Sequence, residues 1–211
     1  MSKGNDADSK NASTRIAIKR PILHHVNLKT ARMQQMIDWY TQVIGVEVVF
    51  QNPVVTFTTN DAANHRIALL TSPLLRDDPD WRIHVGMHHL AFEYGSVDDL
   101  LDTWTRLRDD LGLEPHMSLN HGPTLSFYYV DPDGNSVELQ ADCFGDWAAS
   151  KKFINSSPEF AANPIGEFVD PAKMVAARSA GATSDELLRR AYAGEFPPSA
   201  PPDLRIALPA S

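Results

Sequence analysis

The sequence contains few of the features that mark secreted or membrane-spanning proteins. It has one cysteine, Cys143, in 211 residues. The chain therefore cannot form an internal disulfide, which suits a reducing compartment. No apolar run approaches the roughly 20 residues that a membrane helix needs, and residues 1–20 lack the apolar stretch of a secretory signal. We therefore expect a cytoplasmic protein with no membrane partner.

Positive charge is also scarce. The chain has 19 lysine and arginine residues against 27 aspartate and glutamate residues, which gives a net charge of −8. A chain with this balance and no run of basic residues repels phosphate backbones, so we expect no nucleic-acid partner. Its 43% hydrophobic and 22% charged residues are ordinary for a globular protein.

The distribution of apolar residues divides the chain into three parts. Residues 1–20 are polar and predict a disordered or extended tail. Residues 21–142 are dense in strand and helix patterns and predict the folded domain. Residues 143–211 are rich in proline and predict an extension of mixed helical and extended structure, with a helix over 185–192 that Ser184 caps and Gly194 ends.

The central part contains an internal repeat. The segment LHHVNL at 23–28 resembles MHHLAF at 87–92, and an amphipathic helix pattern follows each copy. Gly45 ends the first helix and Ser96 caps the second. Three strand-like segments follow each helix, at about 46–51, 53–59 and 65–71 and at 114–118, 123–130 and 135–140, with a turn at Asp131-Pro132-Asp133-Gly134.

Each copy therefore reads β-α-β-β-β, over modules at about 21–72 and 85–142. Neither module alone covers its own sheet, so the two should pack together. The sequence predicts an α+β fold in which paired βαβββ modules form a cupped half-barrel around a pocket.

Strand alternation selects candidate metal ligands. It places His25 on the face of Leu23, and His89 on the face of Met87 and Ala91, at equivalent positions of the two modules. Glu138 lies in an apolar strand, where a carboxylate needs a partner. Two imidazoles and one carboxylate around a cavity form a metal site with open positions, which favours Fe(II) and is also possible for zinc.

The motifs resemble those of the vicinal oxygen chelate (glyoxalase/bleomycin resistance/dioxygenase) superfamily, and within it the single-domain type I extradiol dioxygenases. The resemblance covers about 22–140. It rests on LHHVNL, on NHRIALL at 64–70, on MHHLAFEYGSVDDL at 87–100 and on SFYYVDPDGNSVEL at 126–139.

The resemblance implies roles for individual residues. His25, His89 and Glu138 match the metal ligands, His65 matches the acid/base histidine, and Tyr128 matches the active-site tyrosine. The family has a further histidine nine residues before the tyrosine. Position 119 here is leucine, and the nearest candidate is His121, for which we expect a supporting role.

The implied reaction is ring opening of a catechol-type aromatic diol with insertion of both atoms of O2. The implied cofactor is Fe(II), with Mn(II) possible, and we expect a homo-oligomer. Phe57, Leu69, Phe92 and Phe127 are expected to form an apolar wall for the substrate.

Two alternatives stay open. A metal-dependent isomerase or lyase of the glyoxalase type needs a fourth protein ligand, for which the aligned residue, Ala68, is unsuitable. A non-enzymatic protein that sequesters a small molecule needs no metal ligands at all.

Overall fold

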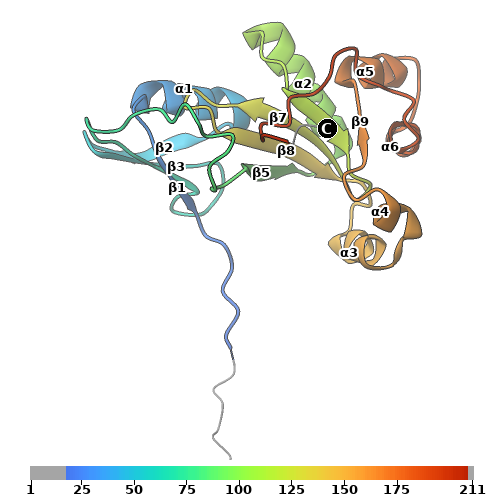
Figure 1. Cartoon of the computed structure of the whole chain (residues 1–211), viewed down its shortest axis with the longest axis horizontal. Coiled ribbons are helices and arrows are strands. Elements are labelled where there is room, and N and C mark those ends of the chain that lie inside the picture. Colours follow the sequence, from blue (N-terminus) through green and yellow to red (C-terminus); the bar gives the residue numbers. More distant parts are fainter. Residues whose placement is uncertain (1–17, 209–211) are drawn as a thin grey trace, which may run out of the picture.

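The computed structural model describes residues 18–208 (Figure 1), so residues 1–17 of the expected N-terminal tail lie outside the described residues. The chain forms two sheets and is an α+β protein, as predicted. The first sheet has the order β1-β4-β3-β2 and the second the order β5-β8-β7-β6-β9. The strands are β1 (Val26–Lys29), β2 (Glu47–Gln51), β3 (Val55–Thr59), β4 (Ile67–Leu70), β5 (His89–Tyr94), β6 (Met117–Asn120), β7 (Thr124–Val130), β8 (Ser136–Asp142) and β9 (Glu167–Phe168).

The two modules repeat one pairing pattern. The first strand of each module runs parallel to its last strand, β1 beside β4 and β5 beside β8, while the remaining pairs are antiparallel. This is the predicted β-α-β-β-β arrangement. Over the described residues the sheets stay open and do not close into a barrel.

The two module helices begin and end largely as their sequences predict. Helix α1 (Met33–Ile44) ends at Gly45, whose φ of 69° is left-handed. Helix α2 (Val97–Leu111) begins after Ser96, whose hydroxyl accepts a hydrogen bond from the backbone N–H of Asp99 at 3.0 Å.

The main hydrophobic core joins residues of both modules in a single cluster. Tyr40 of α1 and Trp104 of α2 are among its largest fully enclosed side chains. Leu69 and Phe127 also belong to this core. The prediction that they form part of a substrate wall is therefore wrong. Alternation along each strand turns these two side chains into the core, and their neighbours face the opposite side of the sheet.

A buried carboxylate connects α1 to the second module. The Tyr40 hydroxyl donates to Asp131 at 3.1 Å, and the same carboxylate accepts from the backbone N–H groups of Asp133 and Asn135 in the β7–β8 turn. Arg32, just before α1, pairs with Asp133 at 2.6 Å. These contacts fix the first module against the turn that precedes Glu138.

The C-terminal extension contributes to both the sheet and the core. It contains α3 (Trp147–Ser156), α4 (Pro158–Ala162), α5 (Pro171–Ser179) and α6 (Ser184–Tyr192), and its strand β9 pairs with β6. The cap of α6 is Thr183, one residue before the expected Ser184, because the Thr183 hydroxyl accepts from the N–H of Glu186. After α6 the chain returns across the second sheet (Figure 1).

None of the helices within residues 18–208 combines the length and the apolar character that crossing a bilayer requires.

Candidate active site

One face of the second sheet carries the ionisable residues of the candidate site. The register pairs Tyr128 of β7 with Glu138 of β8, and pairs Ala91 of β5 with the same Glu138. Because side chains alternate along a strand, His89, two residues before Ala91, lies on this face too. Their neighbours Leu90, Phe127 and Val137 point the other way, into the main core. We call this the site face.

The Glu138 carboxylate is buried and faces His89. Only 6% of Glu138 is exposed, and its Oε2 lies 3.1 Å from the Nε2 atom of His89. Burial opposes the ionised form, but hydrogen bonds from His89 and Ser126 outweigh it and hold the pKa of Glu138 below its ordinary value. The site face therefore carries a negative charge directed at an imidazole nitrogen.

Tyr128 and His121 form a second hydrogen-bonded pair beside Glu138. The Nδ1–H group of His121 donates to the carbonyl of Ile165 at 2.6 Å, so its Nε2 accepts from the Tyr128 hydroxyl at 3.0 Å when the ring is neutral. Burial lowers the pKa of His121, which favours that neutral ring. Burial, and then the charge of Glu138, raise the pKa of the Tyr128 phenol, which therefore keeps its proton.

A close backbone approach holds Ile165 against His121. Gly166 has a φ of 90°, and a Cβ atom added there would lie 2.1 Å from the carbonyl oxygen of Asn120 and 2.6 Å from the Cα atom of His121. Residue 166 must be glycine for the two segments to stay this close.

Replacing Gly166 by alanine should destabilise the protein by about 2 kcal/mol or more, because both the positive φ and the collision must be relieved. Urea denaturation measures this loss. Gly181→Ala is the matched control, since Gly181 also has a positive φ, of 102°, but nothing lies within 4 Å of its added Cβ. Equal losses in the two variants would show that the close approach is unimportant.

The candidate histidines of the first module meet at the ends of two strands. His25 directly precedes β1 and His65 lies two residues before β4, and their ring centroids are 4.4 Å apart. Arg66 connects the two segments, because its guanidinium donates to the carbonyl of His24 at 2.9 Å. Within residues 18–208, the one cluster of three or more His, Cys, Asp or Glu side chains with ligand atoms all within 4.8 Å of one another is His24, His25 and His65.

His65 faces the same side of the first sheet as Phe57. The two rings stack with centroids 4.8 Å apart, and Phe57 pairs with Ala68 across β3 and β4. The odd spacing between His65 and Ala68 does not prevent this, because His65 lies outside the regular strand. Burial, and then the charges of His25 and His24, lower the pKa of His65.

One proposed metal ligand from each module, His25 and His89, lines a shared cavity. A pocket of about 760 Å³ is lined by His25 from the first module and by Met87, His89 and Phe92 from the second. The structure thus brings His89, Glu138 and Tyr128 together on the site face. His25 and His65 lie together at the ends of β1 and β4 in the first sheet. His25 is not in direct contact with the pair of His89 and Glu138.

The donor set on the site face fits a divalent cation. Two ligand atoms that are each about 2.1 Å from one ion and about 90° apart lie roughly 3 Å from each other. The Nε2 atom of His89 and the Oε2 atom of Glu138 are 3.1 Å apart. Imidazole nitrogens and an ionised carboxylate are donors that Fe(II), Mn(II) and Zn(II) accept.

Sequence reasoning missed Ser126. Its side chain is fully buried, and its hydrogen bond helps to keep Glu138 ionised. A signal was present, because Ser126 is a small polar residue two positions before Tyr128 and so lies on the same face of the strand.

Comparisons with known proteins identify relatives of this chain. Residues 22–139 match the model of the Glyoxalase/Bleomycin resistance protein/Dioxygenase superfamily. Biphenyl-2,3-diol 1,2-dioxygenase 2 from Rhodococcus globerulus is 39% identical over 86% of this chain and 94% of its own length. Biphenyl-2,3-diol 1,2-dioxygenase 3 from the same organism is 38% identical over 82% of this chain and 90% of its own.

Among solved structures, lactoylglutathione lyase from Agrobacterium tumefaciens aligns with a TM-score of 0.48 at 23% identity, over 58% of this chain and 96% of the other.

Proposed function

Because the chain belongs to the glyoxalase/bleomycin resistance protein/dioxygenase superfamily, we propose that it is an extradiol dioxygenase. In this proposal it inserts both atoms of O2 into a catechol-type aromatic diol and opens the ring. The two relatives from Rhodococcus globerulus, whose names specify a dioxygenase of an aromatic diol, support this reaction class. The observation that carries the proposal is the buried, ionised Glu138 facing His89, beside a cavity that His25 also lines.

We propose His25, His89 and Glu138 as the ligands of a divalent metal, Fe(II) by preference and Mn(II) as the alternative. When bound, the metal would supply open positions for the two diol oxygens and for O2 and would pass electrons between them. For His25 to join the other two ligands, its ring must turn from His24 and His65 toward the cavity that it shares with His89.

Tyr128 is proposed to orient the substrate. Its high pKa keeps the phenol protonated, so the hydroxyl can donate a hydrogen bond to a diol oxygen placed near Glu138. Without substrate this proton is donated to Nε2 of His121 at 3.0 Å, so the hydroxyl must turn from His121 to the diol oxygen when the substrate binds. Accepting this hydrogen bond stabilises negative charge on the diol oxygen.

His65 is proposed as the acid/base residue. Its lowered pKa favours a neutral ring, which can accept a proton from a diol hydroxyl at a ring nitrogen and later return it to an oxygen of the opened product. Stacking on Phe57 limits the rotation of the ring.

Oxygen uptake tests this function. The protein is loaded anaerobically with Fe(II) and mixed with catechol, 3-methylcatechol and biphenyl-2,3-diol in an oxygen electrode. We expect about one O2 consumed per diol and an absorption band from the conjugated ring-opened product. Bound metal without oxygen uptake from any diol would contradict the proposal and favour an isomerase or lyase. Tight diol binding without metal would instead favour sequestration.

A further inference from the structure

The C-terminal segment 203–207 crosses the second sheet and is anchored at several points. We call this segment the strap. The Arg82 guanidinium pairs with the Asp203 carboxylate through two contacts of 2.8 and 2.7 Å. The backbone N–H of Asp203 donates to the carbonyl of His116 at 3.0 Å, and the Nδ1–H group of His116 donates back to the carbonyl of Asp203 at 2.7 Å.

The strap also contains a strained residue. Arg205 has a φ of 54°, the one positive φ at a residue other than glycine within residues 18–208. Such a conformation costs about 1 kcal/mol or more and persists only where surrounding contacts determine it. The Arg205 guanidinium donates to the carbonyl of Gly134 at 2.6 Å and lies 4.2 Å from the centre of the Trp81 ring.

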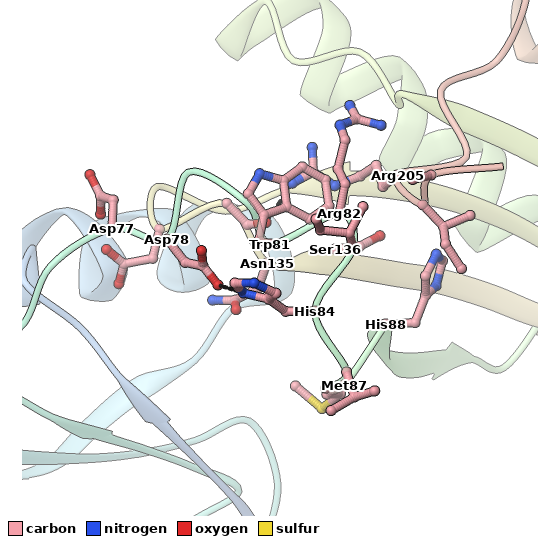
Figure 2. A pocket seen from close by; sticks show the side chains of 17 residues that line it. Asp77, Asp78, Trp81, Arg82, His84, Met87, His88, Asn135, Ser136 and Arg205 are labelled. Carbon is pink, nitrogen blue, oxygen red and sulfur yellow. Dashed lines mark hydrogen bonds and ion pairs between the residues drawn. The ribbon is translucent and has the colours of Figure 1, made fainter. Parts of the chain in front are cut away.

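These contacts lie around a cavity of about 850 Å³, and Figure 2 shows Trp81, Arg82 and Arg205 gathered on one side of it, with His88 on another. Leu204 itself packs against the small apolar cluster of Met117, Leu119 and Tyr128. The position of the Leu204 backbone is therefore fixed by the packing of its own side chain and by the anchored residues before and after it, Asp203 and Arg205.

A chain of hydrogen bonds leads from the strap to the site face. The carbonyl of Leu204 lies 3.0 Å from the Nε2 atom of His88, and a carbonyl can only accept, so Nε2 of His88 carries the proton. In the neutral ring the Nδ1 atom of His88 is then an acceptor. The Nδ1 atom of His89 lies 2.8 Å from it and donates its proton there.

This chain of hydrogen bonds determines which nitrogen of His89 is directed at the proposed metal site. With Nδ1 donating to His88, Nε2 is the nitrogen that faces Glu138, and a bound ion would take the place of the proton that Nε2 donates to this carboxylate when no metal is bound. A metal-binding histidine needs this arrangement, with one nitrogen donating to an orienting partner and the other free for the ion. The same doublet recurs in the first module, where the Nδ1 atoms of His24 and His25 are 3.1 Å apart.

We propose that His88 is a positioning residue that fixes the tautomer and the orientation of His89 for metal binding, and that the Leu204 carbonyl of the strap in turn fixes His88. The proposal rests on the metal site of the proposed function and assigns His88 no contact with substrate or metal.

The test is the metal affinity of three variants, measured anaerobically by competition for Fe(II) with a chromophoric chelator. His88→Ala should weaken affinity by about 10- to 100-fold, the usual cost of losing an orienting partner. His88→Asn should recover most of it, because the amide oxygen can accept the proton of His89. His84→Ala, in an exposed histidine paired with Asp78, should leave affinity unchanged.

Each outcome decides the proposal. Wild-type affinity in His88→Ala would overturn it, and so would equal losses in His88→Asn and His88→Ala, provided that circular dichroism shows both variants folded. A wild-type protein that binds no metal would overturn both this inference and the proposed ligands. A wild-type protein that binds metal but consumes no O2 with any diol would overturn the dioxygenase proposal alone, and the affinity series would still decide the role of His88.

Discussion

Replacing His89 by alanine should weaken metal binding by more than about 100-fold, beyond the cost of losing an outer partner, and abolish measurable oxygen uptake. The variant removes one of three proposed donors. It also removes the hydrogen bond that helps to keep Glu138 ionised, while burial of that carboxyl continues to oppose ionisation. The pKa of Glu138 should therefore rise, which weakens a second donor. Elemental analysis of the Fe(II)-loaded protein and the oxygen electrode measure the two effects.

His84→Ala provides the matched control for this variant. His84 is an exposed histidine of the segment between the modules, and its Nδ1 atom pairs with Asp78 at 2.7 Å. It should retain the wild-type metal content and activity. If His89→Ala retained one equivalent of Fe(II) with wild-type affinity, the proposed ligand set would be wrong.

The second large effect is expected for His65→Ala. Removing a general acid or base lowers turnover by about 10²- to 10⁴-fold, so kcat should fall within this range while metal content stays at the wild-type level. We expect kcat and metal content to respond differently because His65 is proposed to move protons and not to bind the ion. Steady-state oxygen uptake at saturating diol and metal analysis on the same preparation measure both quantities.

Asn64→Ala serves as the control, since Asn64 is an exposed neighbour on the same loop. Full activity in His65→Ala would show that the ring takes no part in the reaction. Loss of metal in His65→Ala would instead indicate that the close group of His24, His25 and His65 holds the ion, in place of the proposed ligand set that includes Glu138.

The sequence predicts the modules well because their signals are local. The doubled LHH and MHH segments, Ser96 before α2 and Gly45 after α1 each act on neighbouring residues, and the structure agrees with all of them. Alternation also places Tyr128 and Glu138 opposite one another on adjacent strands, as the register shows. Periodicity succeeds here because each strand has one face on the core.

Residue type alone misleads where alternation along a strand decides which way a side chain faces. Phe127 was expected in a substrate wall because it is aromatic, but it neighbours Tyr128 and so must face the core. The strand predicted at 114–118 lies at Met117–Asn120 in the structure, because its pairing depends on β7 and β9. The two residues of β9 are too few for any periodicity.

The strap could not be predicted from the sequence at all. Asp203 and Arg82 are 121 positions apart, and each is an ordinary surface charge in its local sequence. The same holds for the bond between His88 and Leu204, which joins residues 116 positions apart. Contacts of this kind depend on the assembled tertiary structure and leave no local pattern.

The matched registers of the two sheets have a consequence for regiochemistry. Phe57 and Ala68 occupy in the first sheet the places of Tyr128 and Glu138 in the second. Two identical modules would create a pocket with twofold symmetry, in which a flat molecule could bind equally well in either of two orientations. In the proposed site the divergence of the modules would remove that degeneracy, since the second module contributes Glu138 and Tyr128 and the first contributes His65. A diol with two inequivalent hydroxyls would then bind one way round and give a single product isomer.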